Sequence, residues 1–255
     1  MKSLLKKNFV DCVGNTPLIK LKVASELSNC EIFGKCEFLN PGGSVKDRPA
    51  VQIINDALKE KKISRGATIV EGTAGNTGIG ICLAGNSLGM KSVIVMPKTQ
   101  SKEKKQMLKL CGADLRLVDA LPYKNPGNYI RFSETLSKSI KNPNGVLWAN
   151  QFDNLSNKKS HYLTTGPEIY NQLGGKVDAF ICSIGTGGTI SGVSDSLKEK
   201  NKKIIIGLAD PMGSAMYNYY KNGKLSSEGS SITEGIGQGR ITKNLKNAEI
   251  DEYFQ

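Results

Sequence analysis

Hydrophobic and polar positions alternate in two recognisable periods from residue 66 onward, so that short β-branched runs and helical stretches follow one another. ATIVEG (67–72) predicts a strand, and NTGIGICLAGNSLG (76–89) predicts a glycine-rich helix. Further strands are predicted at 91–97, 113–119 and 145–150, with helices at 101–112 and 128–140 between them. This alternation is typical of βαβ units, in which helices cover the faces of a parallel sheet.

A second series of the same kind begins at TGPEIYNQLGG (165–175), a predicted helix with Pro167 near its start and a glycine pair at its end. A strand is predicted at 177–184, a glycine loop at 185–189, a helix at 190–200 and a strand at 202–210. We therefore predict an α/β fold of two lobes, each with a mainly parallel sheet flanked by helices. Ligands in such folds bind at the carboxyl ends of the strands.

One lysine lies at the start of a further amphipathic helix. In NPGGSVKDRP (40–49), Lys46 follows two glycines and a serine. The apolar residues that come after it have helical spacing: Ala50, Ile53, Ile54, Ala57 and Leu58. Ser44 is the predicted N-cap, which places Lys46 in the first turn of the helix.

Two glycine loops each connect a predicted strand to a predicted helix. GTGGT (185–189), here called the phosphate loop, can approach a ligand closely and bind an anion through backbone N–H groups. It lacks the dinucleotide fingerprint, because Ile190 stands where the last glycine is needed. The second loop, TAGNT (73–77), is here called the carboxylate loop, since its threonines, Asn76 and backbone amides could hold a carboxylate.

Composition narrows the possible functions. The 35 basic residues exceed the 23 acidic ones, but the lysines are spread along the chain and mixed with glutamates, which indicates solvated surface and no specific nucleic-acid partner. Six cysteines without a C-x-x-C pair and a single histidine argue against a metal site and predict reduced thiols. Without an apolar run of about 18 residues or a signal peptide, we expect a cytoplasmic protein and no membrane partner.

A lysine on a rigid turn and two anion-binding loops together predict Schiff-base chemistry with a ligand that has two anionic ends. Lysine forms Schiff bases, and its pKa falls readily when the side chain is desolvated. Pyridoxal 5′-phosphate needs a phosphate cradle, a lysine for its aldehyde and room for an amino-acid carboxylate. We therefore predict pyridoxal 5′-phosphate as the cofactor.

The motifs VGNTPLIKL (13–21), NPGGSVKDR (40–48), EGTAGNTG (71–78), GTGGT (185–189) and EGIGQGR (234–240) occur in this order. The set closely resembles cysteine synthase, the O-acetylserine sulfhydrylase group of fold-type II pyridoxal-phosphate enzymes, and in particular the cysteine synthase A-like branch. The resemblance covers essentially the whole chain and implies the tryptophan synthase β-like fold. It implies a smaller inserted lobe at 42–150 and a larger lobe made of 1–41 and 151–255.

By matching position, the resemblance implies that Lys46 is the Schiff-base lysine and moves the substrate Cα proton. Asn76 would hydrogen-bond the ring oxygen of the cofactor. The phosphate would be held by Gly185, Thr186, Gly187, Gly188 and Thr189. The substrate would be bound by Thr73, Gly75, Thr77, Gln151 and Gly235, the last of these at the border of the site.

The implied reaction is β-replacement, in which O-acetylserine loses acetate and sulfide adds to give L-cysteine. Homodimers are usual in this family, and some members bind the C-terminal tail of serine acetyltransferase. The sequence leaves two alternatives open. One is cystathionine β-synthase-type β-replacement with homocysteine, and the other is a non-catalytic family member that keeps the fold.

The residue Ala74 and the C-terminal end of the sequence depart from the family pattern. Ala74 stands where relatives often carry serine, so backbone donors are expected to replace one hydroxyl at the carboxylate. Relatives also continue past DEYFQ (251–255) through a further strand and helices, including a residue that meets the pyridine nitrogen. We therefore expect a C-terminally truncated member of the family.

Overall fold

Four parallel strands form the first of two lobes in the computed structural model, which describes residues 5–229 and 232–255. Their order is β5 (Asp114–Val118), β4 (Lys91–Pro97), β3 (Thr68–Gly72) and β6 (Val146–Trp148). Four helices accompany them: α2 (Asp47–Lys59), α3 (Asn76–Asn86), α4 (Lys102–Leu110) and α5 (Tyr129–Ser139). All of β3 is buried, as expected of a central parallel strand.

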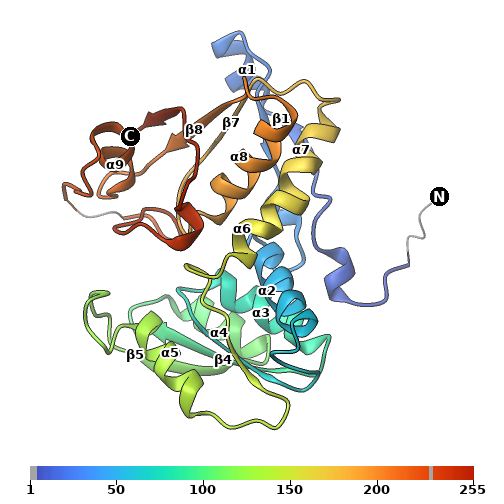
Figure 1. Cartoon of the computed structure of the whole chain (residues 1–255), viewed down its shortest axis with the longest axis vertical. Coiled ribbons are helices and arrows are strands. Elements are labelled where there is room, and N and C mark those ends of the chain that lie inside the picture. The colour runs from blue at the N-terminus through green and yellow to red at the C-terminus, as the bar shows by residue number, and fades with distance from the viewer. Residues whose placement is uncertain (1–4, 230–231) are drawn as a thin grey trace.

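Three parallel strands form the sheet of the second lobe, in the order β7 (Ala179–Cys182), β8 (Ile205–Ala209) and β9 (Glu252–Phe254). Helices α7 (Gly166–Gln172), α8 (Gly188–Lys200) and α9 (Met216–Asn222) and the short η4 (Lys243–Leu245) belong to this lobe. Each lobe has its own core of buried apolar side chains. Figure 1 shows the two lobes one above the other, with α6 (Ser156–Ser160) where they meet. The predicted fold class is confirmed.

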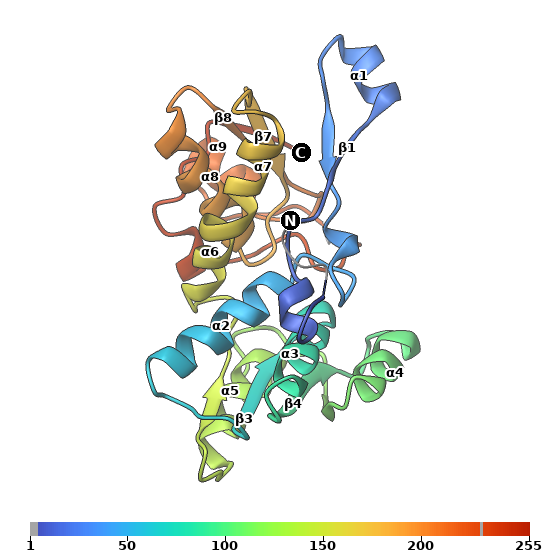
Figure 2. The same ribbon diagram turned by 90° about the vertical axis from the view of Figure 1, so that its right-hand side faces the viewer.

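The N-terminal part forms an arm that the sequence patterns did not predict. It begins with η1 (Phe9–Cys12), and β1 (Leu18–Lys20) then pairs antiparallel with β2 (Phe33–Lys35). Helix α1 (Lys22–Ser28) connects these strands, and η2 (Glu37–Leu39) follows them. Figure 2 shows β1 and α1 standing beside the second lobe.

The predicted helix start near Pro167 is confirmed, because α7 begins at Gly166 with Pro167 in its first turn, but the helical segment before it was not predicted. Helix α6, a π-helical turn at His161–Thr165 and helix α7 follow one another without a break, so Pro167 lies inside a helical run. The wider π-helical turn explains why proline is tolerated at position 167. In this turn the N–H of Gly166 bonds to the carbonyl of His161, five residues earlier, so the usual α-helical hydrogen bonds are interrupted. An undisturbed α-helix would have needed the N–H group that proline lacks.

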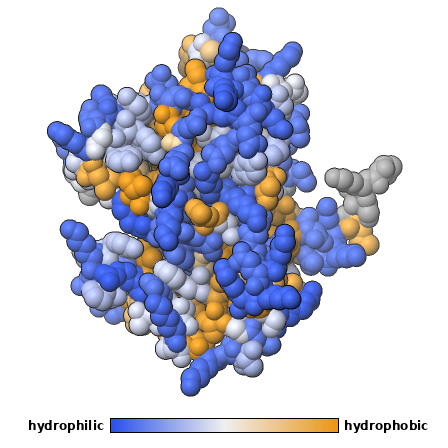
Figure 3. Space-filling view, viewed as in Figure 1, coloured by the Kyte–Doolittle hydropathy of each residue, from blue (hydrophilic) through white to orange (hydrophobic). Residues whose placement is uncertain are grey.

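Hydrophilic side chains cover most of the face shown in Figure 3, over both lobes, and hydrophobic side chains form smaller groups between them. Within residues 5–229 and 232–255, no helix has both the length and the apolar character needed to cross a bilayer.

Candidate functional site

Lys46 lies at the N-terminal end of α2, where the turn that precedes it is fixed by Asp47. The N–H of Gly42 donates to a carboxylate oxygen of Asp47 at 2.5 Å. A side chain at Gly42 would collide with that carboxylate, and the positive φ of 77° at Gly43 also favours glycine. The helix begins at Asp47 with Lys46 as its cap, whereas Ser44 only accepts a hydrogen bond from the N–H of Lys46, so the predicted N-cap is wrong.

The surroundings of Lys46 favour its neutral amine. Burial lowers the pKa of the ammonium group, and the nearby Cys182 and Glu37 oppose this only in part. A neutral amine is the form that attacks a carbonyl or accepts a proton. Helix α2 packs against both α3, which follows the carboxylate loop, and α6, which lies beside the phosphate loop. Lys46 therefore lies near both the carboxylate loop and the phosphate loop.

The phosphate loop has the geometry of an anion cradle. Gly187 caps α8 with a positive φ of 84°, and α8 begins at the next residue. Among the described residues, the backbone N–H groups of Gly185, Thr186 and Gly187 have no hydrogen-bond partner. Unpartnered N–H groups at a helix N-terminus attract an anion. This loop therefore fits a phosphate group.

The hydroxyl of Thr186 is oriented from behind the loop. The Asn157 side-chain amide donates to Thr186 Oγ1 at 2.8 Å, and the Thr242 hydroxyl donates to the Thr186 carbonyl at 2.8 Å. Because Thr186 Oγ1 already accepts a hydrogen bond, its own proton is available to an anion in the cradle. Sequence reasoning missed Asn157, since no motif includes it.

Close packing behind the phosphate loop requires glycine at position 188. A Cβ atom there would collide with the side-chain amide of Asn157. We expect Gly188→Ala to lower the free energy of unfolding by about 1–3 kcal/mol through overpacking, measured by urea denaturation. The control is Gly239→Ala, where a Cβ meets nothing within 4 Å and which should change stability by less than about 0.5 kcal/mol. Equal effects of the two variants would contradict this packing argument.

The carboxylate loop turns tightly into α3. The N–H of Gly75 donates to Thr73 Oγ1 at 3.1 Å, and its φ of 156° favours glycine. Thr73, Gly75 and Thr77 are buried, whereas Asn76 is exposed at the first residue of α3. The predicted hydrogen bond from Asn76 to a cofactor ring stays a prediction.

Gln151 connects the two loops. The Thr77 hydroxyl donates to Gln151 Oε1 at 2.6 Å, and the Asn157 amide that holds Thr186 also donates to the Gln151 carbonyl at 2.8 Å. The Gln151 N–H approaches the carboxyl of Glu71 at 3.4 Å, and burial raises the pKa of Glu71 to about 8. At neutral pH a protonated Glu71 places no negative charge beneath the loop that is predicted to bind a carboxylate.

The segment that contains Gly235 lies against the phosphate loop. A Cβ atom at Gly185 would collide with the Gly235 carbonyl, and the Gln238 amide donates to the Gly185 carbonyl at 3.0 Å. The neighbouring Glu234 forms an ion pair with Lys104 of α4 in the other lobe. Sequence reasoning placed Gly235 at the border of the site but missed this ion pair, for which no local pattern exists.

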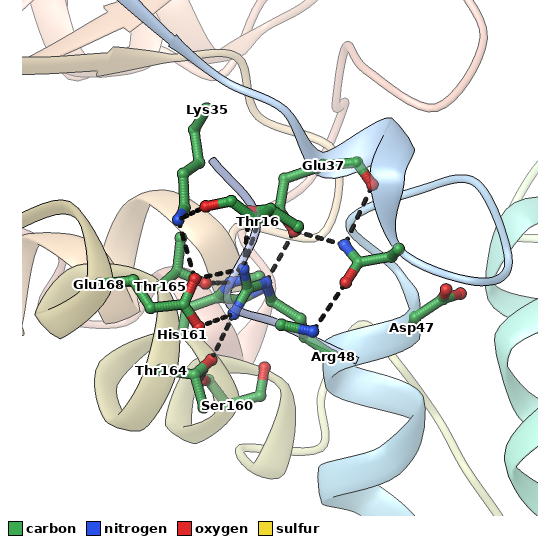
Figure 4. A network of polar contacts seen from close by, with 12 residues as sticks. Thr16, Lys35, Glu37, Asp47, Arg48, Ser160, His161, Thr164, Thr165 and Glu168 are labelled. Carbon is green, nitrogen blue, oxygen red and sulfur yellow. Dashed lines mark hydrogen bonds and ion pairs between the residues drawn. The ribbon is translucent and has the colours of Figure 1, made fainter. Parts of the chain in front are cut away.

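A buried ionic network fixes α2 to the second lobe (Figure 4). The guanidinium of Arg48 donates to both oxygens of Glu168 at 2.7 Å and to both oxygens of Glu37 at 2.7 and 2.8 Å. Burial alone would raise the pKa of Glu168, but hydrogen bonds from Arg48 and Lys35 outweigh it and hold the pKa at about 2. The network therefore anchors the helix that carries Lys46.

Comparisons with known proteins agree with this geometry. The family described as pyridoxal-phosphate dependent enzyme matches residues 10–255. Cysteine synthase 1 of Neurospora crassa is 49% identical over 245 residues, which are 95% of this chain but only 64% of that protein. Cysteine synthase B of Campylobacter jejuni is 40% identical over 242 residues, which are 95% of this chain and 76% of that protein.

Among solved structures, the O-acetylserine-dependent cystathionine β-synthase from Helicobacter pylori is similar with a TM-score of 0.85 and 33% identity. The match covers 98% of this chain and 79% of that one. The predicted family is thereby confirmed, and this chain belongs to the pyridoxal-phosphate-dependent enzymes.

Proposed function

We propose that the chain binds pyridoxal 5′-phosphate through Lys46 and forms L-cysteine from O-acetylserine and sulfide. The observation that carries this proposal is a lysine of lowered pKa at a helix N-terminus, beside a phosphate loop and a carboxylate loop that Gln151 connects. Similarity to two cysteine synthases, at 49% and 40% identity, supports it.

The bound cofactor would supply an electron-withdrawing ring that stabilises negative charge at the substrate Cα. Lys46 Nζ would take the Cα proton while acetate leaves, and would return that proton after sulfide has added to the β-carbon. Thr73, Gly75 and Thr77, around the start of α3, would hold the substrate carboxylate together with Gln151. The hydrogen bond from the Thr77 hydroxyl to Gln151 Oε1 fixes the position of the Gln151 amide. Asn76 would donate to the ring oxygen of the cofactor, and Gly235 would border the site.

The test is turnover of O-acetylserine and sulfide by the purified chain with added cofactor. We expect L-cysteine and acetate in equal amounts. A protein that binds the cofactor at Lys46 but releases neither product would contradict the proposed reaction.

The alternative function is β-replacement of the cystathionine β-synthase type. The structural similarity to the Helicobacter pylori protein supports this alternative. Replacing sulfide with homocysteine separates the two, because only the alternative predicts cystathionine as the main product. A folded protein without β-replacement activity on either acceptor would instead support a non-catalytic family member.

We also propose the lobe boundaries, the oligomeric state and a protein partner of the chain. A smaller lobe at 42–150 and a larger lobe at 1–41 and 151–255 are supported by two separate apolar cores, one within residues 50–149 and the other within 169–245. The family resemblance supports a cytoplasmic homodimer with serine acetyltransferase as a partner. Sedimentation of the purified chain, with and without the C-terminal peptide of that partner, tests both associations.

A further inference from the structure

His161, the single histidine of the chain, lies behind the phosphate loop with 1% of its surface exposed. It begins the π-helical turn between α6 and α7. Figure 4 shows His161 and Thr165 on the same helical segment as Thr164 and Glu168. Helix α8 approaches this turn closely because Gly192 has no side chain, since a Cβ there would collide with His161.

Both ring nitrogens of His161 are engaged by threonine hydroxyls. Nδ1 lies 2.9 Å from Thr165 Oγ1, and Nε2 lies 3.2 Å from Oγ1 of Thr189, the last residue of the phosphate loop. Burial lowers the pKa of His161 to about 3, and the positive charge of Arg48 adds to this effect against the opposing charge of Glu168. The imidazole is therefore neutral, so one nitrogen donates and the other accepts.

The direction of these hydrogen bonds follows from the Thr165 hydroxyl. Thr165 is 2% exposed, and within the described residues its hydroxyl has no partner other than His161 Nδ1. A buried hydroxyl proton without an acceptor is costly, so Thr165 donates to Nδ1. The histidine proton then resides on Nε2 and is donated to Thr189 Oγ1.

Thr189 can consequently use its own proton elsewhere. Within the part of the chain that the structure describes, its Oγ1 has only His161 as a partner, and its side chain is only partly buried. In the opposite tautomer His161 Nε2 carries no proton, so Thr189 would have to donate its own proton to Nε2. Thr189 Oγ1 would then present only lone pairs to an anion. The arrangement parallels Thr186, whose Oγ1 accepts from Asn157.

We propose that Thr165, His161 and Thr189 form a directed hydrogen-bond relay that presents the Thr189 hydroxyl as a donor to the phosphate group of the cofactor. His161 is thus a positioning residue that acts through Thr189 without touching the ligand. This inference rests on the proposed binding of pyridoxal 5′-phosphate at the phosphate loop.

The first experiment reads the tautomer without any cofactor. Because the chain has one histidine, a long-range ¹H–¹⁵N spectrum of the ¹⁵N-labelled protein reports its two ring nitrogens without assignment. We expect protonated Nε2 and unprotonated Nδ1 at pH 7, unchanged at pH 5. A protonated Nδ1 at pH 7 would overturn the relay whether or not the cofactor binds.

The second experiment compares dissociation constants for pyridoxal 5′-phosphate and for pyridoxal, which lacks the phosphate. In His161→Phe and Thr189→Val we expect about 10–100-fold weaker binding of pyridoxal 5′-phosphate, the range for a hydrogen bond to a charged group. Binding of pyridoxal should stay within about twofold of the wild type. Thr189→Ser keeps the hydroxyl and should restore binding of the phosphorylated form.

Tyr162→Phe is the matched control, because it removes a hydroxyl from the same turn. Among the described residues, that hydroxyl donates to Glu199 alone, at the surface. Equal losses for both ligands in the Thr189→Val variant would show a merely structural role and overturn the proposal, even if His161→Phe fails to fold. If the wild type binds neither pyridoxal 5′-phosphate nor pyridoxal, the proposed function is refuted, and so is the phosphate group as the ligand of Thr189. The tautomer of His161 is measured without cofactor and does not depend on that result.

Discussion

We expect Lys46→Ala to abolish covalent attachment of pyridoxal 5′-phosphate and to reduce the proposed β-replacement by about 10²–10⁴-fold, the contribution of a proton-transferring group. The wild type should show a visible absorption band with added cofactor, and borohydride reduction followed by peptide mapping should place the pyridoxyl label on Lys46. The variant should show neither. Its fold should persist, because the mutation removes a side chain whose charged form burial already disfavours.

Lys59 provides the matched control, since it is an exposed lysine in the last turn of the same helix. Lys59→Ala should keep the absorption band, the labelled peptide and the activity of the wild type. A pyridoxyl label on another lysine, with Lys46→Ala fully active, would refute the role of Lys46 and with it the proposed mechanism.

The sequence predicted the parts of this site that are local in the chain. The phosphate loop and the carboxylate loop each lie where a strand runs into a helix, and glycine and threonine at such a junction indicate an anion site in any α/β fold. Lys46 was found for the same reason, because the glycines before it and the helix after it are within ten residues. The alternating strands and helices from residue 67 onward also follow from local periodicity.

The contacts that support these loops could not be predicted in this way. Arg48 meets Glu168 across 120 residues, and His161 reaches Thr189 across 28 residues, so neither pair has a spacing that a sequence pattern reveals. The π-helical turn was hidden because Pro167 predicts a helix start. The N-terminal arm was missed because its strands have three residues each and are too short for an alternating pattern.

Arg48→Met should cost about 3–5 kcal/mol of unfolding free energy at pH 7, because it removes the guanidinium from between the largely buried carboxylates of Glu37 and Glu168 and leaves only Lys35 beside Glu168. Urea denaturation followed by circular dichroism measures this loss. Arg65→Met, at an exposed loop position after α2, is the control and should change stability by less than about 0.5 kcal/mol.

The pH dependence distinguishes lost charge pairing from lost packing. In the wild type the pKa of Glu168 is depressed to about 2, below the value of about 4.3 in an unfolded chain. Its contribution to stability is therefore present above about pH 4.3 and is lost as the pH falls toward 2. In Arg48→Met the carboxyls that have lost Arg48 are stabilised by protonation, so the difference in unfolding free energy from the wild type should narrow as the pH falls from 7 toward 3. A difference that stays constant over this range would mean that Arg48 acts through its packing and that the buried charges contribute little to anchoring α2.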